Sequence, residues 1–320
     1  MIKRPFGILV AATLLASFFG SADAEEIRLA AQPVPCYAPI FVAKKKGWLD
    51  EELAGFGAPT VVLTTFAAGP PINESFAAGQ QDFGFLGDTP AIIGKSVGLD
   101  TSLIGKASVG PTSLAVIVAA GSQIASPADL KGRKVAVTKG SYAHHLLALV
   151  LQQAHLTVND IELINLPNSD IPPALLAGSI DAGTVWEPVI TRFLSQKSIR
   201  VLADGTGIKS GVLAVVARTD FVKNKPEQTK AVLRAYARGA QFIKDHPQEA
   251  ADLVTEDVHL TPDLLVPVLA KFDFNPVLRD EDIAEMKKSA DFMKSAGLIR
   301  TAIDIDAFAD RTINRAAGLK

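Results

Sequence analysis

The chain contains nearly the same phrase twice, and this repetition constrains its fold more than any other feature. Residues 76–90 read FAAGQQDFGFLGDTP, and residues 175–188 read LLAGSIDAGTVWEP. Both copies contain Ala-Gly-x-x-Asp-x-Gly, an apolar run, an acidic residue and a proline. The apolar run predicts a short buried strand, and the acidic residue with its proline predicts a helix start directly after it. Each copy therefore predicts a helix–strand–helix passage.

The same alternation continues on both sides of the two copies. Apolar and β-branched runs predict strands at 27–31, 60–66, 82–87, within 126–141, and at 161–166, 181–186 and 211–217. Periodic stretches predict helices at 38–49 and 70–79, from Asp88, from Ser141, from a cap at Asp170 to Gly178, and from Glu187-Pro188. This order is typical of parallel α/β sheets. After residue 225 the chain reads as mostly helical, with clear helices at 226–244 and 280–296.

The two copies lie in different halves of the chain, and each delivers a helix start to the carboxyl end of a strand. In open α/β sheets that end of the strands is where ligands bind. We therefore predict two sheets that face each other across a cleft, each contributing half of a binding site. The alternative is a chance similarity between two common helix–strand connections.

The first 24 residues have the pattern of a cleaved secretory signal peptide. Lys3 and Arg4 form a basic start, residues 6–19 are apolar, and Ala22-Asp23-Ala24 supplies a small-x-small cleavage site. The apolar run is too short to span a bilayer, because spanning needs about 20 residues. The pattern predicts export to the periplasm.

Charge and cysteine content exclude several classes of protein. The 32 basic and 34 acidic residues give a formal net charge of −2, and no basic block stands out, so nucleic acid is not an expected partner. The single cysteine, Cys36, excludes an intrachain disulfide.

Four strand-to-helix junctions are suited to hold a small anion. Helix starts offer unpaired N–H groups and the positive end of a dipole. Thr89 and Ser141 would add hydroxyl groups there, although each could simply cap its own helix. Two of the three tyrosines and one of the two tryptophans fall at these junctions, where they would wall a small pocket. The junctions are Pro35-Cys36-Tyr37-Ala38, Gly87-Asp88-Thr89, Gly140-Ser141-Tyr142 and Trp186-Glu187.

Patterns of catalysis and metal binding are incomplete. Gly94-Lys95-Ser96 resembles the end of a phosphate-binding loop, but the first glycine of that motif is replaced by Thr89. Ser141 lies near His144 without a Gly-x-Ser-x-Gly elbow. His144 and His145 are adjacent, which is poor spacing for metal ligands on a helix. We predict no catalytic residue, metal or cofactor, and His144 is either a ligand contact or structural.

Asp88 and Glu187 leave two interpretations open. A carboxylate at a helix start most often caps its own helix. Turned into the cleft, either carboxylate would repel an anion and attract an amine.

Several quoted stretches together resemble the periplasmic aliphatic sulfonate-binding proteins of ABC importers, within the nitrate/sulfonate/taurine substrate-binding family. These stretches are FGFLGDTPAIIGKSVGLD, DLKGRKVAVTKGSYAHHLL, LAGSIDAGTVWEP and RVLADGTGI. The similarity runs through residues 27–220 and is loose beyond them.

This resemblance implies a type II-like fold of two α/β lobes joined by two hinge crossings. Lobe 1 would comprise residues 25–111 and 212–320, and lobe 2 residues 112–211. The ligand would be a small organic anion, an aliphatic sulfonate or a taurine-like molecule, which a monomeric binding protein passes to a membrane permease. The expected binding residues are Gln32, Cys36, Tyr37, Gly87, Asp88, Thr89, Thr112, Ser113, Gly140, Ser141, Tyr142, His144, Trp186 and Glu187.

Other readings of the resemblance remain. The sulfonate-type loop after the first strand usually lacks the Cys36-Tyr37 pair, so nitrate, a sulfate ester or a pyrimidine are alternative ligands. An enzyme on the same fold, similar to thiamin-pyrimidine synthases, is the rival from another class. A ligand-sensing partner of a membrane receptor would share the site but not the permease.

Overall fold

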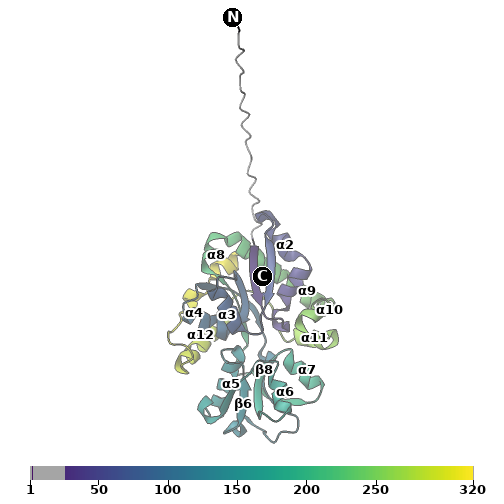
Figure 1. The fold of residues 1–320 in the computed structure, drawn as a ribbon, viewed down its shortest axis with the longest axis vertical. Helices are drawn as coiled ribbons and strands as arrows, with labels where there is room; N and C mark the ends of the chain where they lie inside the picture. The colour runs from purple at the N-terminus through teal and green to yellow at the C-terminus, as the bar shows by residue number, and fades with distance from the viewer. Residues whose placement is uncertain (1, 3–25, 320) are drawn as a thin grey trace.

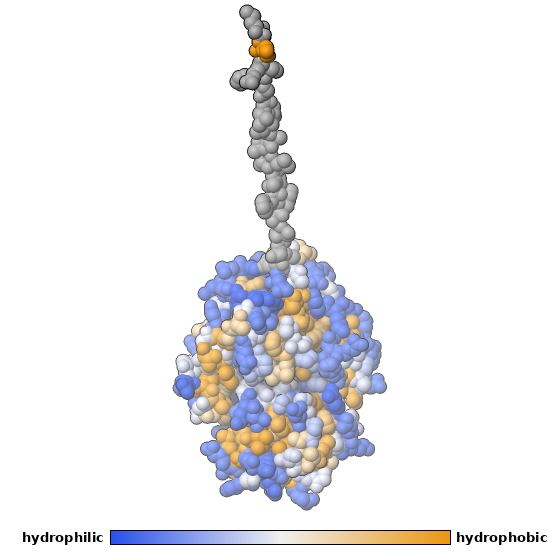
Figure 2. Space-filling view, viewed as in Figure 1, coloured by the Kyte–Doolittle hydropathy of each residue, from blue (hydrophilic) through white to orange (hydrophobic). Residues whose placement is uncertain are grey.

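The computed structural model describes residue 2 and residues 26–319. The expected signal peptide lies outside this part, except for residue 2. Within the described residues, two five-stranded sheets flanked by helices form two lobes, one above the other in Figure 1. The outline narrows where the lobes meet (Figure 2). No helix in the described part is long and apolar enough to cross a membrane.

Lobe 1 is built on a sheet with the strand order β2-β1-β3-β10-β4. Its strands are β1 (Glu26–Ala31), β2 (Thr60–Thr65), β3 (Phe83–Gly87), β4 (Thr101–Val109) and β10 (Val212–Arg218). The helices before the first crossing are α1 (Ala38–Lys45), α2 (Trp48–Leu53), α3 (Gly69–Ala77) and α4 (Asp88–Ser96).

Lobe 2 has the sheet order β7-β6-β8-β5-β9. Its strands are β5 (Leu114–Ala119), β6 (Lys134–Val137), β7 (Glu162–Asn165), β8 (Ala182–Trp186) and β9 (Ile199–Asp204). Its helices are α5 (Tyr142–Gln153), α6 (Ile171–Leu176) and α7 (Val189–Ser195). This membership supports the predicted lobe boundaries, which stay a prediction.

The two copies of the phrase occupy equivalent places. β3 and β8 are each the middle strand of five, with a parallel strand on one side and an antiparallel crossing strand on the other. Register agrees as well, because Ala30 pairs with Gly84 in lobe 1 and Ala136 pairs with Gly183 in lobe 2. The repetition in sequence is therefore a repetition of architecture.

The two glycines and the first aspartate that both copies share have the same structural roles in the two lobes. Gly79 and Gly178 adopt left-handed φ values of 70° and 71°, which end α3 and α6. The aspartate then accepts a backbone N–H of the neighbouring strand: Asp82 from Arg28 at 2.9 Å, and Asp181 from Lys134 at 2.8 Å.

The second glycine of each copy allows close packing of helix on strand. A Cβ on Gly84 would lie 2.6 Å from Phe76, and one on Gly183 would lie 2.2 Å from Ile171. Both distances are too short for a side chain, so only glycine fits where α3 and α6 cross these strands.

The expected parallel sheets are in fact mixed, which corrects the sequence prediction. β10 runs antiparallel to β3 and β4, and β5 runs antiparallel to β8 and β9. The chain enters lobe 2 through β5 and returns to lobe 1 through β10. Because the preceding strand lies in the other sheet, neither strand is reached by the helical crossover that a parallel neighbour requires. The apolar runs of β4, β5 and β9 were not assigned as strands from sequence.

Two local predictions also need correction. The helix expected at 38–49 breaks at Gly47, whose φ of 73° separates α1 from α2. Asp170 does not cap α6, since its carboxylate accepts the hydroxyl of Ser169 and makes no capping bond.

The C-terminal helices pack on lobe 1. They are α8 (Thr219–Asn224), α9 (Pro226–Asp245), α10 (Pro247–Val258), α11 (Pro262–Leu269), α12 (Asp280–Ser295), α13 (Ile305–Phe308) and α14 (Arg311–Ala316). The helices expected at 226–244 and 280–296 are confirmed as α9 and α12. On α9, Tyr236 stacks on Phe85 of β3 at 5.4 Å, and its hydroxyl donates to the Ala107 carbonyl at 2.5 Å. α12 lies against α4 (Figure 1).

Candidate functional site

Most of the predicted site residues are buried where the lobes meet. A Cβ placed on Gly87, at the end of β3, would lie 3.0 Å from Cβ of Tyr142, so the start of α4 touches the start of α5. Gly140 is partly exposed, and Thr112 is exposed on the turn Pro111–Ser113. The buried members are Gln32, Cys36, Tyr37, Gly87, Asp88, Thr89, Ser113, Ser141, Tyr142, His144, Trp186 and Glu187.

An aromatic cluster contains residues from both lobes. The rings of Tyr142 and Trp186 in lobe 2 lie 5.7 Å apart. Burial raises the pKa of the Tyr142 hydroxyl well above its ordinary value, and nearby Cys36 of lobe 1 adds to the shift. Gln32 donates to the Tyr37 hydroxyl at 3.4 Å. Cys36, Tyr37, Tyr142 and Trp186 therefore belong to one buried cluster that spans both lobes.

Asn168, which the sequence did not single out, fixes the backbone at Trp186. The Trp186 N–H donates to the Asn168 Oδ1 at 3.1 Å, and the Asn168 amide returns a 3.5 Å bond to the Trp186 carbonyl. The sequence could have indicated Asn168 by its position in the loop after β7, because this strand ends at the same edge of the sheet as β8.

The start of α5 has the geometry of a capped helix. Ser141 is the N-cap, and its Oγ accepts the His144 N–H at 3.3 Å. The Gly140 N–H donates to the His144 Nδ1 at 3.4 Å, so His144 bonds to its own loop. Burial lowers the pKa of His144. A neutral His144 would leave this helix start without a competing fixed charge.

Asp88 is the first residue of α4 and is fully buried. Its Oδ1 accepts the Thr89 N–H at 2.6 Å and the Thr89 hydroxyl at 3.1 Å. Its Oδ2 lies 2.5 Å from Nζ of Lys209 and accepts the Ser289 hydroxyl at 2.7 Å. Burial, the largest single influence, raises the pKa of Asp88, but the charge of Lys209, nearby His145 and the hydrogen bonds from Lys209 and Ser289 together lower it.

His145 completes this cluster from lobe 2. Its Nδ1 lies 3.1 Å from Lys209 Nζ, and its ring stacks on Phe292 of α12 at 4.4 Å. Burial, followed by the charge of Lys209, lowers the pKa of His145 to about 3. The ring is therefore neutral near pH 7, and its Nδ1 can accept a bond from the lysine.

Glu187 has a matching arrangement on the other side of the molecule. Its carboxylate accepts the Thr191 N–H at 3.0 Å and hydroxyl at 2.8 Å, so it does cap α7. The same carboxylate lies 2.5 Å from Nζ of Lys271, which follows α11 on lobe 1. Neither of the two interpretations of Asp88 and Glu187 given from sequence, helix capping or facing the cleft, included a lysine partner. Lys209 and Lys271 lie far away in sequence, so no local pattern could reveal them.

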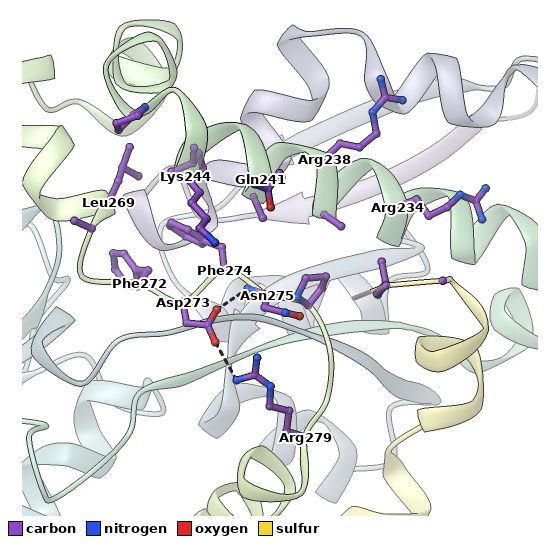
Figure 3. Close-up of a pocket in the computed structure, with 18 of the residues that line it drawn as sticks. Arg234, Arg238, Gln241, Lys244, Leu269, Phe272, Asp273, Phe274, Asn275 and Arg279 are labelled. Carbon is purple, nitrogen blue, oxygen red and sulfur yellow. Dashed lines mark hydrogen bonds and ion pairs between the residues drawn. The ribbon is translucent and has the colours of Figure 1, made fainter.

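A groove with a volume of about 1000 Å³ lies away from this cluster, on lobe 1. Figure 3 shows Lys244 beside Phe272 and Phe274, with Asp273 joined to Arg279 at 3.5 Å. None of the predicted site residues lines it. Among the described residues, no group of three or more His, Cys, Asp or Glu side chains could hold a metal ion.

Two paired α/β lobes, with helix starts and aromatic side chains meeting between them, define the class of two-lobed periplasmic binding proteins. The chain belongs to the NMT1/THI5 like family, whose model matches residues 34–250. The resemblance stated from sequence is thereby confirmed at the level of the family.

Individual relatives agree with this assignment. The chain is 29% identical to a putative aliphatic sulfonates-binding protein of Bacillus subtilis, over 99% of this chain and 97% of that one. It is 30% identical to the putative aliphatic sulfonates-binding protein of Escherichia coli, over 75% and 76%. A crystal structure of the periplasmic aliphatic sulphonate binding protein SsuA from Escherichia coli matches with a TM-score of 0.78 and 26% identity, covering 89% and 92%.

Proposed function

We propose that this protein is the extracytoplasmic substrate-binding protein of an ABC importer and holds a small organic sulfonate between its lobes. The observation that carries the proposal is the single buried cluster that contains Cys36 and Tyr37 from lobe 1 and Tyr142 and Trp186 from lobe 2. A ligand stabilises the closed form only through contacts with both lobes at once. We propose a sulfonate as the ligand because the relatives are named as aliphatic sulfonates-binding proteins.

The anionic end of the ligand would lie at the helix starts. Ser141 and the adjoining N–H groups of α5 are neutral donors for an oxyanion. The Thr89 hydroxyl at the start of α4 would join them by turning from Asp88 to the ligand. The carbon chain of the ligand would lie against Trp186, a residue that is 2% exposed. The two nearby carboxylates are already paired with lysines, so an anion would not meet an uncompensated negative charge.

An enzymatic role receives less support from the same residues. Burial raises the pKa of the Cys36 thiol well above its ordinary value, and nearby Glu187 adds to the shift, which disfavours a reactive thiolate. Lys209 and Lys271 both hold carboxylates, so neither amine is poised for covalent chemistry. These observations favour binding over turnover.

Export to the periplasm, a monomeric state and delivery to a membrane permease complete the proposal. Export rests on the signal-peptide pattern and on the family, in which a relative's structure is described as periplasmic, and delivery to a permease rests on the family alone.

A thermal-shift screen of the mature chain tests the function. The ligands would be alkanesulfonates, taurine, nitrate, sulfate and a pyrimidine, each also incubated with the protein and assayed for products. We expect a rise in Tm with organic sulfonates and no product. Stabilisation by the pyrimidine or nitrate alone, or the appearance of product, would contradict the proposal.

A further inference from the structure

Lys209 lies on one of the two connections between the lobes. It belongs to the segment 205–211, which leads from β9 in lobe 2 to β10 in lobe 1. The Gly205 N–H donates to the Pro111 carbonyl at 2.9 Å, so this segment is bonded to the other connection. Although Lys209 sits on a loop, its side chain is fully buried.

The ammonium group contacts three separate elements. It reaches Asp88 on α4 at 2.5 Å, His145 on α5 at 3.1 Å, and Ser289 on α12 at 3.3 Å. A lysine has three donors, and these three contacts use all of them. α4 and α12 belong to lobe 1 and α5 to lobe 2, so the bonds join the lobes through a connecting segment.

The same contacts connect Lys209, through Asp88, to Thr89, whose hydroxyl is the expected donor to the sulfonate. Asp88 uses one oxygen for Lys209 and Ser289 and the other for Thr89. Lys209 thereby fixes the orientation of the carboxylate that orients the Thr89 hydroxyl. It also neutralises a fully buried negative charge that would otherwise repel an anionic ligand.

Resting on the proposed function, we propose that Lys209 is a positioning residue for ligand binding, which keeps Asp88 charged but neutralised and ties the start of α4 to α5 when the lobes meet. It does this without touching the ligand. The titratable groups that face Asp88 are Lys209, His145, Tyr37 and Tyr142. Since burial raises the pKa of both tyrosines, they stay neutral, and Lys209 is the cation that balances Asp88.

The pH dependence of butanesulfonate affinity tests this role. In the wild-type protein the affinity should be nearly constant from about pH 5.5 to about pH 8, because the pKa of Asp88 lies below this range. In Lys209→Met the buried, unpaired Asp88 should have a raised pKa. Affinity should then fall about tenfold or more at high pH and recover as the pH is lowered.

The double variant Lys209→Met/Asp88→Asn should bind independently of pH and regain most of the lost affinity. Lys288→Met, at a side chain that is 78% exposed, is the matched control and should behave like the wild type. A merely structural lysine would weaken binding equally at every pH, and that result would overturn the proposal. If Lys209→Met does not fold, Lys209→Gln is measured instead, with the same expectations.

Small-angle scattering of the ligand-free proteins provides a readout that does not depend on the sulfonate. Lys209→Met should have a larger radius of gyration than the wild type, because a bond between the lobes is lost. If the wild-type protein binds no sulfonate, the proposed function fails, and this comparison still decides on Lys209. Equal radii for the two proteins would contradict the proposed link between the lobes.

Discussion

Nζ of Lys271 lies 2.5 Å from Oε1 of Glu187, and the two residues come from different lobes. Glu187 is the acidic residue near the end of the second copy of the repeated phrase, as Asp88 is in the first. Each of these buried carboxylates therefore meets a lysine from outside the phrase: Asp88 meets Lys209 on the α4 and α12 side, and Glu187 meets Lys271 on the α7 and α11 side. In Figure 1, α4 and α12 lie on one side of the molecule and α7 and α11 on the other, so the two ion pairs lie on opposite sides.

Loss of the Lys271 charge should weaken ligand binding. Glu187 is 1% exposed, so Lys271→Met would leave a buried carboxylate with only Thr191 as its partner. Because Lys271 itself is 28% exposed, we expect a loss of about 1–2 kcal/mol in sulfonate binding. Calorimetric titration measures it, with Lys223→Met at an exposed site as the control. An unchanged Kd would show that the pair does not contribute to closure.

Thr89→Ala should weaken binding by about 1–2 kcal/mol, the scale of one hydrogen bond to a charged group. In the structure the Thr89 hydroxyl donates to Asp88. A bound sulfonate must therefore either take over this hydroxyl bond or bind the backbone N–H groups that Thr89 helps to order. Thr89→Ser is the matched variant and should retain most of the affinity. Equal affinity of the alanine variant and the wild type would remove Thr89 from the site.

The aromatic cluster should make the protein select organic over inorganic anions. Each methylene buried against Trp186 should contribute about 0.8 kcal/mol, so affinity should rise from methane- to butanesulfonate and sulfate should bind weakly. Since Asp88 and Glu187 are both paired with lysines, taurine should gain nothing over ethanesulfonate from its amine. Titration of this series is the measurement. Sulfate binding as tightly as butanesulfonate would show that the cluster is only core packing.

The sequence predicted the parts of the fold that depend on local pattern. Gly79 and Gly178 end their helices as expected, and the strands β3 and β8 follow from their apolar runs. The direction of β10 and β5 could not be predicted, because it depends on how the chain crosses between lobes. The lysine partners of Asp88 and Glu187 were missed for the same reason, since 121 and 84 residues separate the pairs.

His145 should make the stability depend on pH. Its pKa is about 3 in the folded protein and near 6.5 when exposed, so the unfolded chain binds more protons between these values. This contribution to stability is complete above pH 6.5 and is lost as the pH falls towards 3. We expect a loss of about 2 kcal/mol between pH 7 and pH 5, measured by urea unfolding. His145→Gln should reduce this slope and His155→Gln, at an exposed site, should not; the opposite ranking would refute the assignment.

A crystal structure with bound butanesulfonate tests the central claim most directly. The account predicts the sulfonate group between the starts of α4 and α5, within hydrogen-bond distance of Ser141, and the butyl chain against the ring of Trp186. Lys209 should remain on Asp88 and Lys271 on Glu187. Butanesulfonate bound elsewhere, for example in the groove beside Lys244 and Phe272, with the residues between the lobes unchanged, would contradict it.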